Sequence, residues 1–280
     1  MSKGKSKIKK LSAKNKRNNI ILLILLCILI ILLIILSIKK IFFVDKFYKI
    51  ESRIKNVEKM KSKETDDYKI SGWIRVQGTN IDYPLIGPKS DTSPLPENIE
   101  KYAWLESEDF KHHNVVNIQG HNIMNLGSEP ILHDSSFTRF EELMDFVYYD
   151  FAKDNKYIQL TLDGKEYLYQ IFATGFIKGY EYTILSDGEY TNKELIDYID
   201  TVKNNSIYDY NIKVDTDDNF ITLATCTRFN DNKGEMFYVS GRLVENGERI
   251  LNYSVVRNKN YEKVGKVLKG DGLNGTKENS

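Results

Sequence analysis

The chain has 280 residues, of which 41% are hydrophobic, and this is enough to form one good-sized domain with additional segments. Its formal net charge of +1 at pH 7 gives no electrostatic reason to expect nucleic acid as a partner. The only cysteines in the sequence are Cys27 and Cys226. Because Cys27 falls in an apolar N-terminal run, Cys226 has no disulfide partner in the rest of the chain. A lone thiol of this kind is either a packing residue or a reactive group.

The N-terminal region predicts a membrane anchor. Residues 20–38 are almost entirely Ile and Leu, and as a helix they span about 28 Å, close to the thickness of the hydrocarbon core of a bilayer. Residues 1–19 are basic and contain no acidic residue, which predicts a cytoplasmic tail, a single membrane pass and an extracellular position for everything after Lys40. A cleaved signal peptide is the alternative, but the run exceeds the usual apolar region of roughly 7–15 residues, and no small-residue cleavage pattern follows it.

The segment from residue 41 to residue 69 predicts a helical linker and N-terminal helix. Its apolar residues recur every three or four positions, as Phe47, Ile50, Ile54 and Val57 illustrate, and this spacing is typical of an amphipathic helix. We expect its apolar face to pack on the domain that follows.

Residues 70–257 predict one mainly β domain. The strand-like segments are residues 72–76, 81–85, 115–118, 157–162, 167–177, 220–225 and 236–244, and Asp163-Gly164 is a hairpin turn sequence between two of them. Helical segments are expected around residues 136–148 and 192–204. Short strands interrupted by helices favour a β-barrel or sandwich with helices inserted in its loops. Residues 258–280 lack periodicity and predict a disordered tail.

Cys226 and His121 each follow an apolar strand where it runs into polar sequence. Strand ends hold reactive side chains on a rigid scaffold. Cysteine catalysis needs an imidazole that pairs with the thiolate and later protonates the leaving amine, so the two residues are candidate partners. The ordinary alternatives are a buried strand cysteine and a surface histidine. The other histidines lie in polar sequence and are expected to be solvated: His112, His113 and His133.

The motifs around these two residues resemble those of the sortase family. Thr-Leu-Ala-Thr-Cys at residues 222–226 matches the family motif T-L-x-T-C, and Gly-His-Asn at residues 120–122 resembles its histidine motif. The histidine precedes the cysteine by about a hundred residues, as in the family. The opening Gly-Trp-Ile-Arg-Val, followed by Gly-Thr-Asn-Ile-Asp-Tyr-Pro, extends the similarity over residues 68–244. The single N-terminal anchor and the helix expected before the cysteine strand are most like class B.

The resemblance implies a closed β-barrel with helices inserted in its loops. It also implies a cysteine transpeptidase that cleaves a sorting pentapeptide near the C-terminus of secreted proteins. Cys226 would form a thioester with the peptide, His121 would protonate the departing amine, and Thr225 would bind the substrate. The acceptor amine would come from a cell-wall precursor or a pilin lysine. The expected location is the cell membrane of a Gram-positive bacterium.

The chain departs from the family at one position. Sortases carry an arginine at the start of the last strand, and this sequence has Met236 there. A planar guanidinium can hold a substrate carbonyl or stabilise an oxyanion, whereas a methionine side chain cannot. Arg228, two residues after Cys226, is the preferred replacement. Arg242 is the alternative, although six residues of strand put it roughly 20 Å from Met236.

Two other functions compete with this one. An extracellular cysteine peptidase or amidase of another family is one, although many such folds place the cysteine on a helix and before the histidine. A catalytically impaired, sortase-like binding module is the other, and Met236 favours it. Acidic residues at positions 106–109 and 215–218 have the composition of calcium loops. Solvated loops explain these residues better than a calcium site does, so neither a metal nor a cofactor is expected.

Overall fold

The structure is a computed structural model, and it describes residues 18–34, 52–64, 68–88, 103–105, 113–126, 139–178, 186, 188–229, 234–245, 254–259 and 261. The chain divides into two units, Met1–Glu51 and Ser52–Ser280, which are described separately.

In the first unit, residues 18–34 form an α-helix whose Ile and Leu side chains are exposed. Within the described part of the chain, no helix combines the length and the apolar character needed to cross a membrane. Residues 35–38 of the predicted anchor and residues 41–51 of the predicted linker lie outside the described residues.

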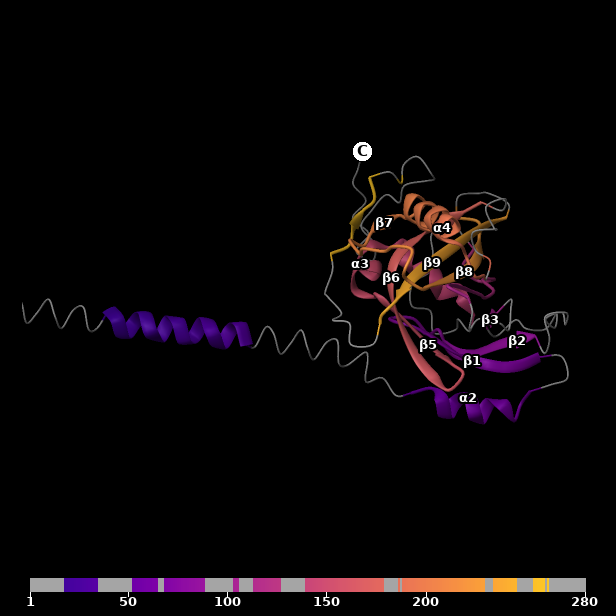
Figure 1. The fold of residues 1–280 in the computed structure, drawn as a ribbon, viewed down its shortest axis with the longest axis horizontal. Coiled ribbons are helices and arrows are strands. Elements are labelled where there is room, and N and C mark those ends of the chain that lie inside the picture. Colours follow the sequence, from indigo (N-terminus) through magenta and orange to yellow (C-terminus); the bar gives the residue numbers. More distant parts are fainter. Residues whose placement is uncertain are drawn as a thin grey trace, which may run out of the picture. The chain divides into compact units, whose positions relative to one another are not determined.

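The second unit is built on a closed β-barrel (Figure 1). Its strands follow one another around the barrel in the order β1-β2-β3-β4-β8-β9-β6-β5. The pairs β2–β3 and β4–β8 are parallel, and the remaining pairs are antiparallel. The strands are β1 (Tyr68–Val76), β2 (Asp82–Pro88), β3 (Ala103–Leu105), β4 (Val115–Gln119), β5 (Tyr157–Leu162), β6 (Lys165–Ile177), β8 (Phe220–Thr227) and β9 (Glu235–Leu243).

The predicted mainly β barrel is therefore confirmed. The β5–β6 turn at Asp163-Gly164 has positive φ at both residues, 51° and 69°, as a tight hairpin with the twist of its strands requires. β3 was not predicted, because three residues are too short to show alternation.

Two of the helices, α2 and α4, pack on the outside of the barrel, whereas the apolar side chains of η2 belong to the inner core. α2 (Ile54–Lys61) packs on β1 and β2 through Val57, and it is shorter than the predicted helix. β1 already begins at Tyr68, within the range expected to be helical. The helix expected around residues 136–148 is a 3-10 helix, η2 (Phe140–Val147), followed by α3 (Tyr149–Asp154), because Tyr148 between them is extended.

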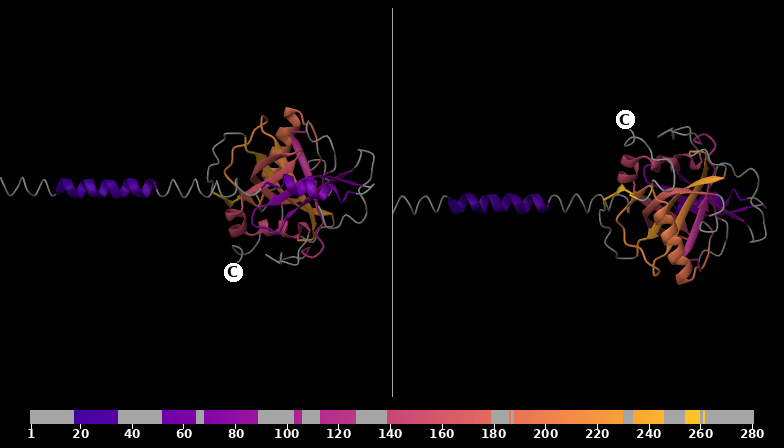
Figure 2. Two further views of the ribbon diagram at one scale, coloured as in Figure 1. Left: turned by 90° about the horizontal axis from the view of Figure 1, so that it is seen from below. Right: turned by 90° about the horizontal axis from the view of Figure 1, so that it is seen from above.

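α4 (Asn192–Asn204) has the predicted bounds. It starts at a capping box in which the Thr191 hydroxyl accepts from the amide of Glu194 and the Glu194 carboxylate accepts from the amide of Thr191. Figure 2 shows α4, in orange, on the outside of the barrel strands. Its buried face, which includes Leu195 and Tyr198, packs on the outer side chains of β8 and β9.

The alternation of side chains divides β8 and β9 into two faces. Ile221, Leu223, Phe237 and Val239 belong to the core inside the barrel. Phe220, Ala224, Met236 and Tyr238 belong to the outer cluster under α4. This division decides which side chains share a face with Cys226.

The compact unit continues beyond the predicted boundary at residue 257. β10 (Val256–Arg257) pairs with β7 (Tyr208–Asp209), and the Asn258 side chain donates to the Ser206 carbonyl at 2.7 Å. Tyr261 is only 2% exposed. The body therefore includes Tyr261, whereas residues 262–280 of the predicted tail lie outside the described residues.

Candidate active site

Parallel pairing of β4 with β8 brings the two candidate catalytic residues to the same end of the barrel. The register runs from Val115 opposite Phe220 to Gln119 opposite Ala224. The amide of Gly120 then donates to the carbonyl of Ala224 at 3.2 Å, one step beyond the end of β4. Continuing in this register, the next residues are His121 and Cys226, on adjacent strands.

The two side chains share the outer face. Cys226 lies two residues after Ala224, whose side chain belongs to the outer cluster, and His121 lies six residues after Val115, which belongs to the same cluster. Because an even separation along a strand keeps a side chain on the same face, the alternation directs Cys226 outward. His121 lies beyond the end of β4, and its ring contacts Trp104, which pairs with Gln119 on the outer face. The thiol is exposed at the surface.

Cys226 has a largely apolar setting despite this exposure. Its cross-strand partner on β9 is Met236, which is buried. Burial raises the pKa of the Cys226 thiol above its ordinary value. The Cys226 thiol is therefore neutral near pH 7 in the free protein, and a base has to assist its deprotonation.

The ring of His121 packs against Trp104. The two ring centroids are 4.9 Å apart with an interplanar angle of 55°. Trp104 belongs to β3 and pairs with Gln119, so it shares the outer face of β4. No motif indicated Trp104, because it lies in the short strand that the pattern of the sequence did not reveal.

Phe140 holds the turn that carries His121, through one backbone hydrogen bond and through the packing of its ring. The carbonyl of His121 accepts from the amide of Phe140 at 2.9 Å. A side chain at Gly120 would not fit, since a Cβ there would lie 2.4 Å from the Phe140 ring. The glycine of the histidine motif is therefore required by the close packing of the Phe140 ring against it.

Asn122 links the histidine turn to the cysteine strand. Its side chain is 4% exposed, and its amide nitrogen donates to the carbonyls of Asn125 at 2.9 Å and Cys226 at 3.1 Å. Its amide oxygen accepts from the backbone N–H of Asn125 at 2.9 Å. One buried amide thus holds the His121 turn and the Cys226 backbone together.

Thr225, which the resemblance to sortases predicts to bind the substrate, has a buried side chain. Its side chain is 0% exposed and lies on the inner face, opposite to Cys226. The hydroxyl donates to the carbonyl of Gly120 at 2.6 Å. Because the hydroxyl is buried and hydrogen-bonded to the backbone, Thr225 supports the junction of β4 and β8.

The two candidate arginines lie at opposite ends of the cysteine strand. Arg228 is exposed, follows Cys226 by two residues and so emerges on the same side. Its backbone amide donates to the Leu126 carbonyl at 3.2 Å, and within the described part of the chain its side chain has no hydrogen bond or ion pair. Arg242, on the adjacent strand β9, lies opposite Phe220 and forms an ion pair with Asp218 at 3.3 Å. Arg242 is therefore remote from the thiol.

No group of three or more His, Cys, Asp or Glu side chains among the described residues is arranged to hold a metal ion. The acidic loop at residues 215–218 is organised by its own hydrogen bonds, in which the amide of Asp215 donates to the Asp218 carboxylate at 2.8 Å. Residues 106–109, His112 and His133 lie outside the described residues.

The chain is similar to known sortases in sequence and fold. It is 27% identical to sortase B of Listeria monocytogenes over 180 residues, which are 62% of this chain and 69% of that protein. It is 24% identical to sortase B of Staphylococcus aureus over 160 residues, 56% of this chain and 63% of that protein, so it spans just under two thirds of this relative. No family model matches the chain.

Solved structures share the fold at lower identity. The X-ray structure of Clostridium perfringens sortase B superposes with a TM-score of 0.54 at 20% identity and covers 68% of this chain and 99% of that one. The Staphylococcus aureus sortase B–substrate complex gives 0.50 at 19% identity, covering 74% and 92% of the two chains. The closed barrel of this chain, with a thiol and an imidazole near the ends of adjacent parallel strands, therefore has the fold of these sortase B structures. The sequence relatives add that the chain is similar to sortases and most like those of class B.

The pKa of Cys226 yields a first prediction. Since burial raises this pKa, the thiolate fraction at pH 7 should be smaller than that of a free cysteine, whose pKa is about 8.5. Alkylation by iodoacetamide should therefore rise about tenfold per pH unit through pH 8.5 and level off only above it. The measurement uses mass spectrometry on a Cys27→Ser variant, in which Cys226 is the remaining thiol, with the urea-unfolded chain as reference. A plateau below pH 7 would mean that pairing with His121 outweighs burial.

Asn122 yields a second prediction. Asn122→Ala should lower the turnover of a sorting peptide roughly 10- to 100-fold with little change in KM, because the imidazole and the thiol lose their common anchor. Asn122→Asp should not restore turnover, since a carboxylate cannot donate to the Cys226 carbonyl. The control is Asn205→Ala, which removes one amide hydrogen bond to Thr201 at the end of α4, away from the site. Equal kinetic losses in the two Ala variants would contradict a positioning role for Asn122.

Proposed function

We propose that the chain is a membrane-anchored cysteine transpeptidase that cleaves the sorting peptide of secreted proteins and transfers the product to an amine. The observation that carries this proposal is the placement of His121 and Cys226 on one face, at the ends of β4 and β8, in a barrel of the sortase fold. Sortase B of Staphylococcus aureus forms a complex with a substrate, and by extension we propose that the present chain binds a substrate at the corresponding site.

The proposed reaction proceeds in two acyl-transfer steps. His121 takes the thiol proton, and the Cys226 sulfur attacks the carbonyl carbon of the threonine in the sorting motif. The tetrahedral intermediate collapses as the C–N bond breaks, and the leaving amine receives the proton from His121. An incoming amine then loses a proton to His121 and attacks the thioester, so that a new amide forms and the C–S bond breaks. The thiol is regenerated, and no cofactor is consumed.

The oxyanion of each intermediate needs donors on the outer face. Met236 lies directly across from Cys226 and supplies none. Arg228 is the described arginine nearest to Cys226 along the chain, and its side chain is not committed to another described residue. We therefore assign oxyanion stabilisation to Arg228, since a guanidinium offers several donors in a rigid plane.

We further propose that residues 20–38 anchor the protein in the cell membrane, with the basic tail in the cytoplasm and the barrel outside. The unbroken apolar run and the basic residues before it support this topology. The partners would be secreted proteins that carry a sorting pentapeptide and an amine acceptor from a cell-wall precursor or a pilin lysine. The chemistry of the site is common to both acceptors.

A second candidate function is that of a binding module that holds sorting peptides without turning them over. Met236 beside the thiol is the observation that favours it, because a thioether neither carries charge nor donates a hydrogen bond to an oxyanion. The two functions differ in whether the natural protein releases a cleaved peptide.

The nucleophile is tested by Cys226→Ala in the full-length chain held in lipid nanodiscs. Cleavage of fluorogenic sorting pentapeptides should be lost, and addition of triglycine to the wild type should convert the acid product into an amide. The free energy of unfolding should change by less than about 1 kcal/mol, because the thiol is exposed at a strand end and leaves no cavity. Cys27→Ala is the matched control and should keep full activity. Residual cleavage above a tenth of wild type would exclude Cys226 as the nucleophile.

The arginine assignment is tested by a matched pair of variants. Arg228→Ala should lower turnover about 10²–10³-fold, the usual effect of removing one oxyanion donor. Arg228→Lys should recover little, because a point charge does not replace the planar fork. Arg242→Ala should affect turnover only mildly, since its guanidinium pairs with Asp218 at the other end of the strand. If the wild type cleaves no peptide and Met236→Arg does, the natural protein is the binding module.

The topology is tested on whole cells. Protease added outside should remove the barrel domain and leave the basic N-terminal tail protected, as an uncleaved anchor requires. An epitope at residue 1 and a second one at residue 280 distinguish the two fragments on a blot. Recovery of protein that begins after Ser37 from the culture medium would show that the apolar run is a signal peptide.

A further inference from the structure

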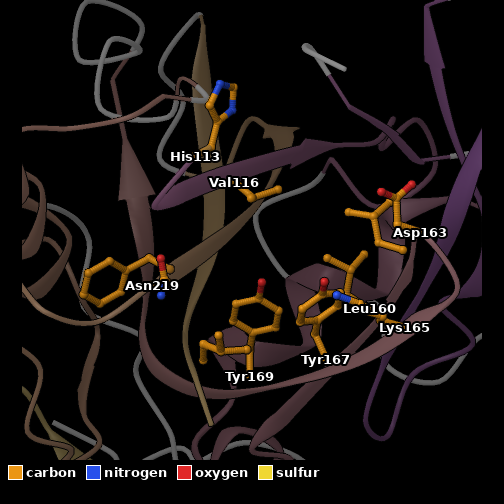
Figure 3. Close-up of a pocket in the computed structure, with 11 residues that line it drawn as sticks. His113, Val116, Leu160, Asp163, Lys165, Tyr167, Tyr169 and Asn219 are labelled. Atoms are coloured by element: carbon orange, nitrogen blue, oxygen red, sulfur yellow. The ribbon is translucent and has the colours of Figure 1, made fainter. Parts of the chain in front are cut away.

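A pocket of about 570 Å³ lies at the end of the barrel opposite to Cys226 (Figure 3). It is bounded by the starts of β4 and β8, the end of β9 and the hairpin of β5 and β6. Phe220 and Cys226 are six residues apart on β8, so the pocket is roughly 20 Å from the thiol. It is therefore separate from the proposed active site.

The walls of the pocket are mixed, with an apolar part formed by the inner faces of the strands and polar groups around it. Val116, Leu160 and Leu162 line it and belong to the core inside the barrel. Its volume falls in the range of small-molecule sites, which combine apolar walls with a few polar groups.

Two tyrosines of β6 direct their hydroxyl groups into this space. Figure 3 shows Tyr167 and Tyr169 side by side with both hydroxyls pointing into the pocket below Val116. Tyr169 is only 5% exposed, and neither hydroxyl has a hydrogen-bond partner among the described residues. Both hydroxyls face the open space of the pocket, so they are available to a ligand.

The place of Tyr169 is fixed by the backbone around it. A Cβ at Gly241 on β9 would lie 2.9 Å from the Cβ of Tyr169, so a glycine there makes room for the tyrosine. Burial, with a smaller effect of the neighbouring Tyr167, raises the pKa of Tyr169 well above its usual range. Its hydroxyl thus stays protonated and acts as a donor.

The charged groups of the pocket favour one negative charge. Lys165 lines the pocket and lies two residues before Tyr167 on β6, so both side chains are on the same face of the strand. Lys165 forms no ion pair with a described residue. Asp163, on the hairpin turn, also lines it and repels additional negative charge. A doubly charged phosphate fits this set less well than a carboxylate, which accepts hydrogen bonds at two oxygens.

We propose that this pocket binds a small monocarboxylate with an apolar body, whose carboxylate accepts hydrogen bonds from Tyr167, Tyr169 and Lys165. The apolar body lies against Leu160, Leu162 and Val116. The proposal concerns binding alone and does not depend on the function assigned to Cys226.

The test measures binding of radiolabelled 3-phenylpropanoate by equilibrium dialysis against full-length protein in nanodiscs, with empty nanodiscs subtracted. We expect saturable binding in the millimolar range or tighter, and at least tenfold weaker binding of the neutral 3-phenylpropanamide. Tyr169→Phe and Lys165→Gln should each weaken binding of the acid about tenfold, because each removes one donor to a charged group. Neither substitution leaves a cavity in the hydrophobic core, so both variants should fold.

The control variants remove a tyrosine hydroxyl and a lysine amine at positions outside the pocket. Tyr157→Phe and Lys178→Gln alter a buried tyrosine and an exposed lysine near the other end of the hairpin and should leave binding unchanged. Peptide cleavage by Tyr169→Phe should equal that of the wild type, which separates this site from the active site. Three results would overturn the proposal: no saturable binding at millimolar concentration, equal affinities for the acid and the amide, or an unchanged affinity in Tyr169→Phe.

Discussion

The parallel pairing of β4 with β8 is the contact on which the rest of the site depends. Parallel neighbours end on the same side of a sheet, so the two strand ends meet although residues 120–219 separate them along the chain. Such a pair requires a long crossover connection, and η2, α3, β5, β6 and α4 all lie within it. An antiparallel pairing would have carried His121 to the far end of β8. The chemistry proposed for the chain therefore rests on a long-range contact of the main chain.

Strand pairing alone does not hold two side chains at a fixed separation beyond the strand ends. Past Gln119 the chain leaves the sheet, and its position is set by Asn122, by Phe140 and by the hydrogen bond from Thr225 to Gly120. These groups are buried and paired with the backbone, so each would leave an unsatisfied partner if it were removed. The exposed thiol and the half-buried imidazole are thus supported by polar contacts that the solvent does not reach.

The sequence alone indicated most of this barrel and both candidate catalytic residues, because strand alternation and the motifs around His121 and Cys226 are local features. The register is not a local feature, which explains why Thr225 was assigned to the substrate when it lies on the inner face. Trp104 was not predicted to lie at the site, because its strand has three residues and shows no alternation in the sequence. For Arg242, in contrast, counting along the strand was sufficient, since its distance from Met236 follows from the length of β9.

The orientation of Cys226 also depends on contacts far from it. Side chains alternate along a strand, so a shift of one residue in β8 would turn Cys226 inward and expose Thr225. Such a shift would break the contact between the hydroxyls of Tyr198 on α4 and Thr222, which are 2.7 Å apart, and the contact of Thr222 with Ser240 on β9 at 3.0 Å. It would also place Ile221 and Leu223 under α4 in place of the smaller Ala224. α4 therefore contributes no catalytic group but stabilises the one register of β8 in which the Cys226 thiol faces the solvent.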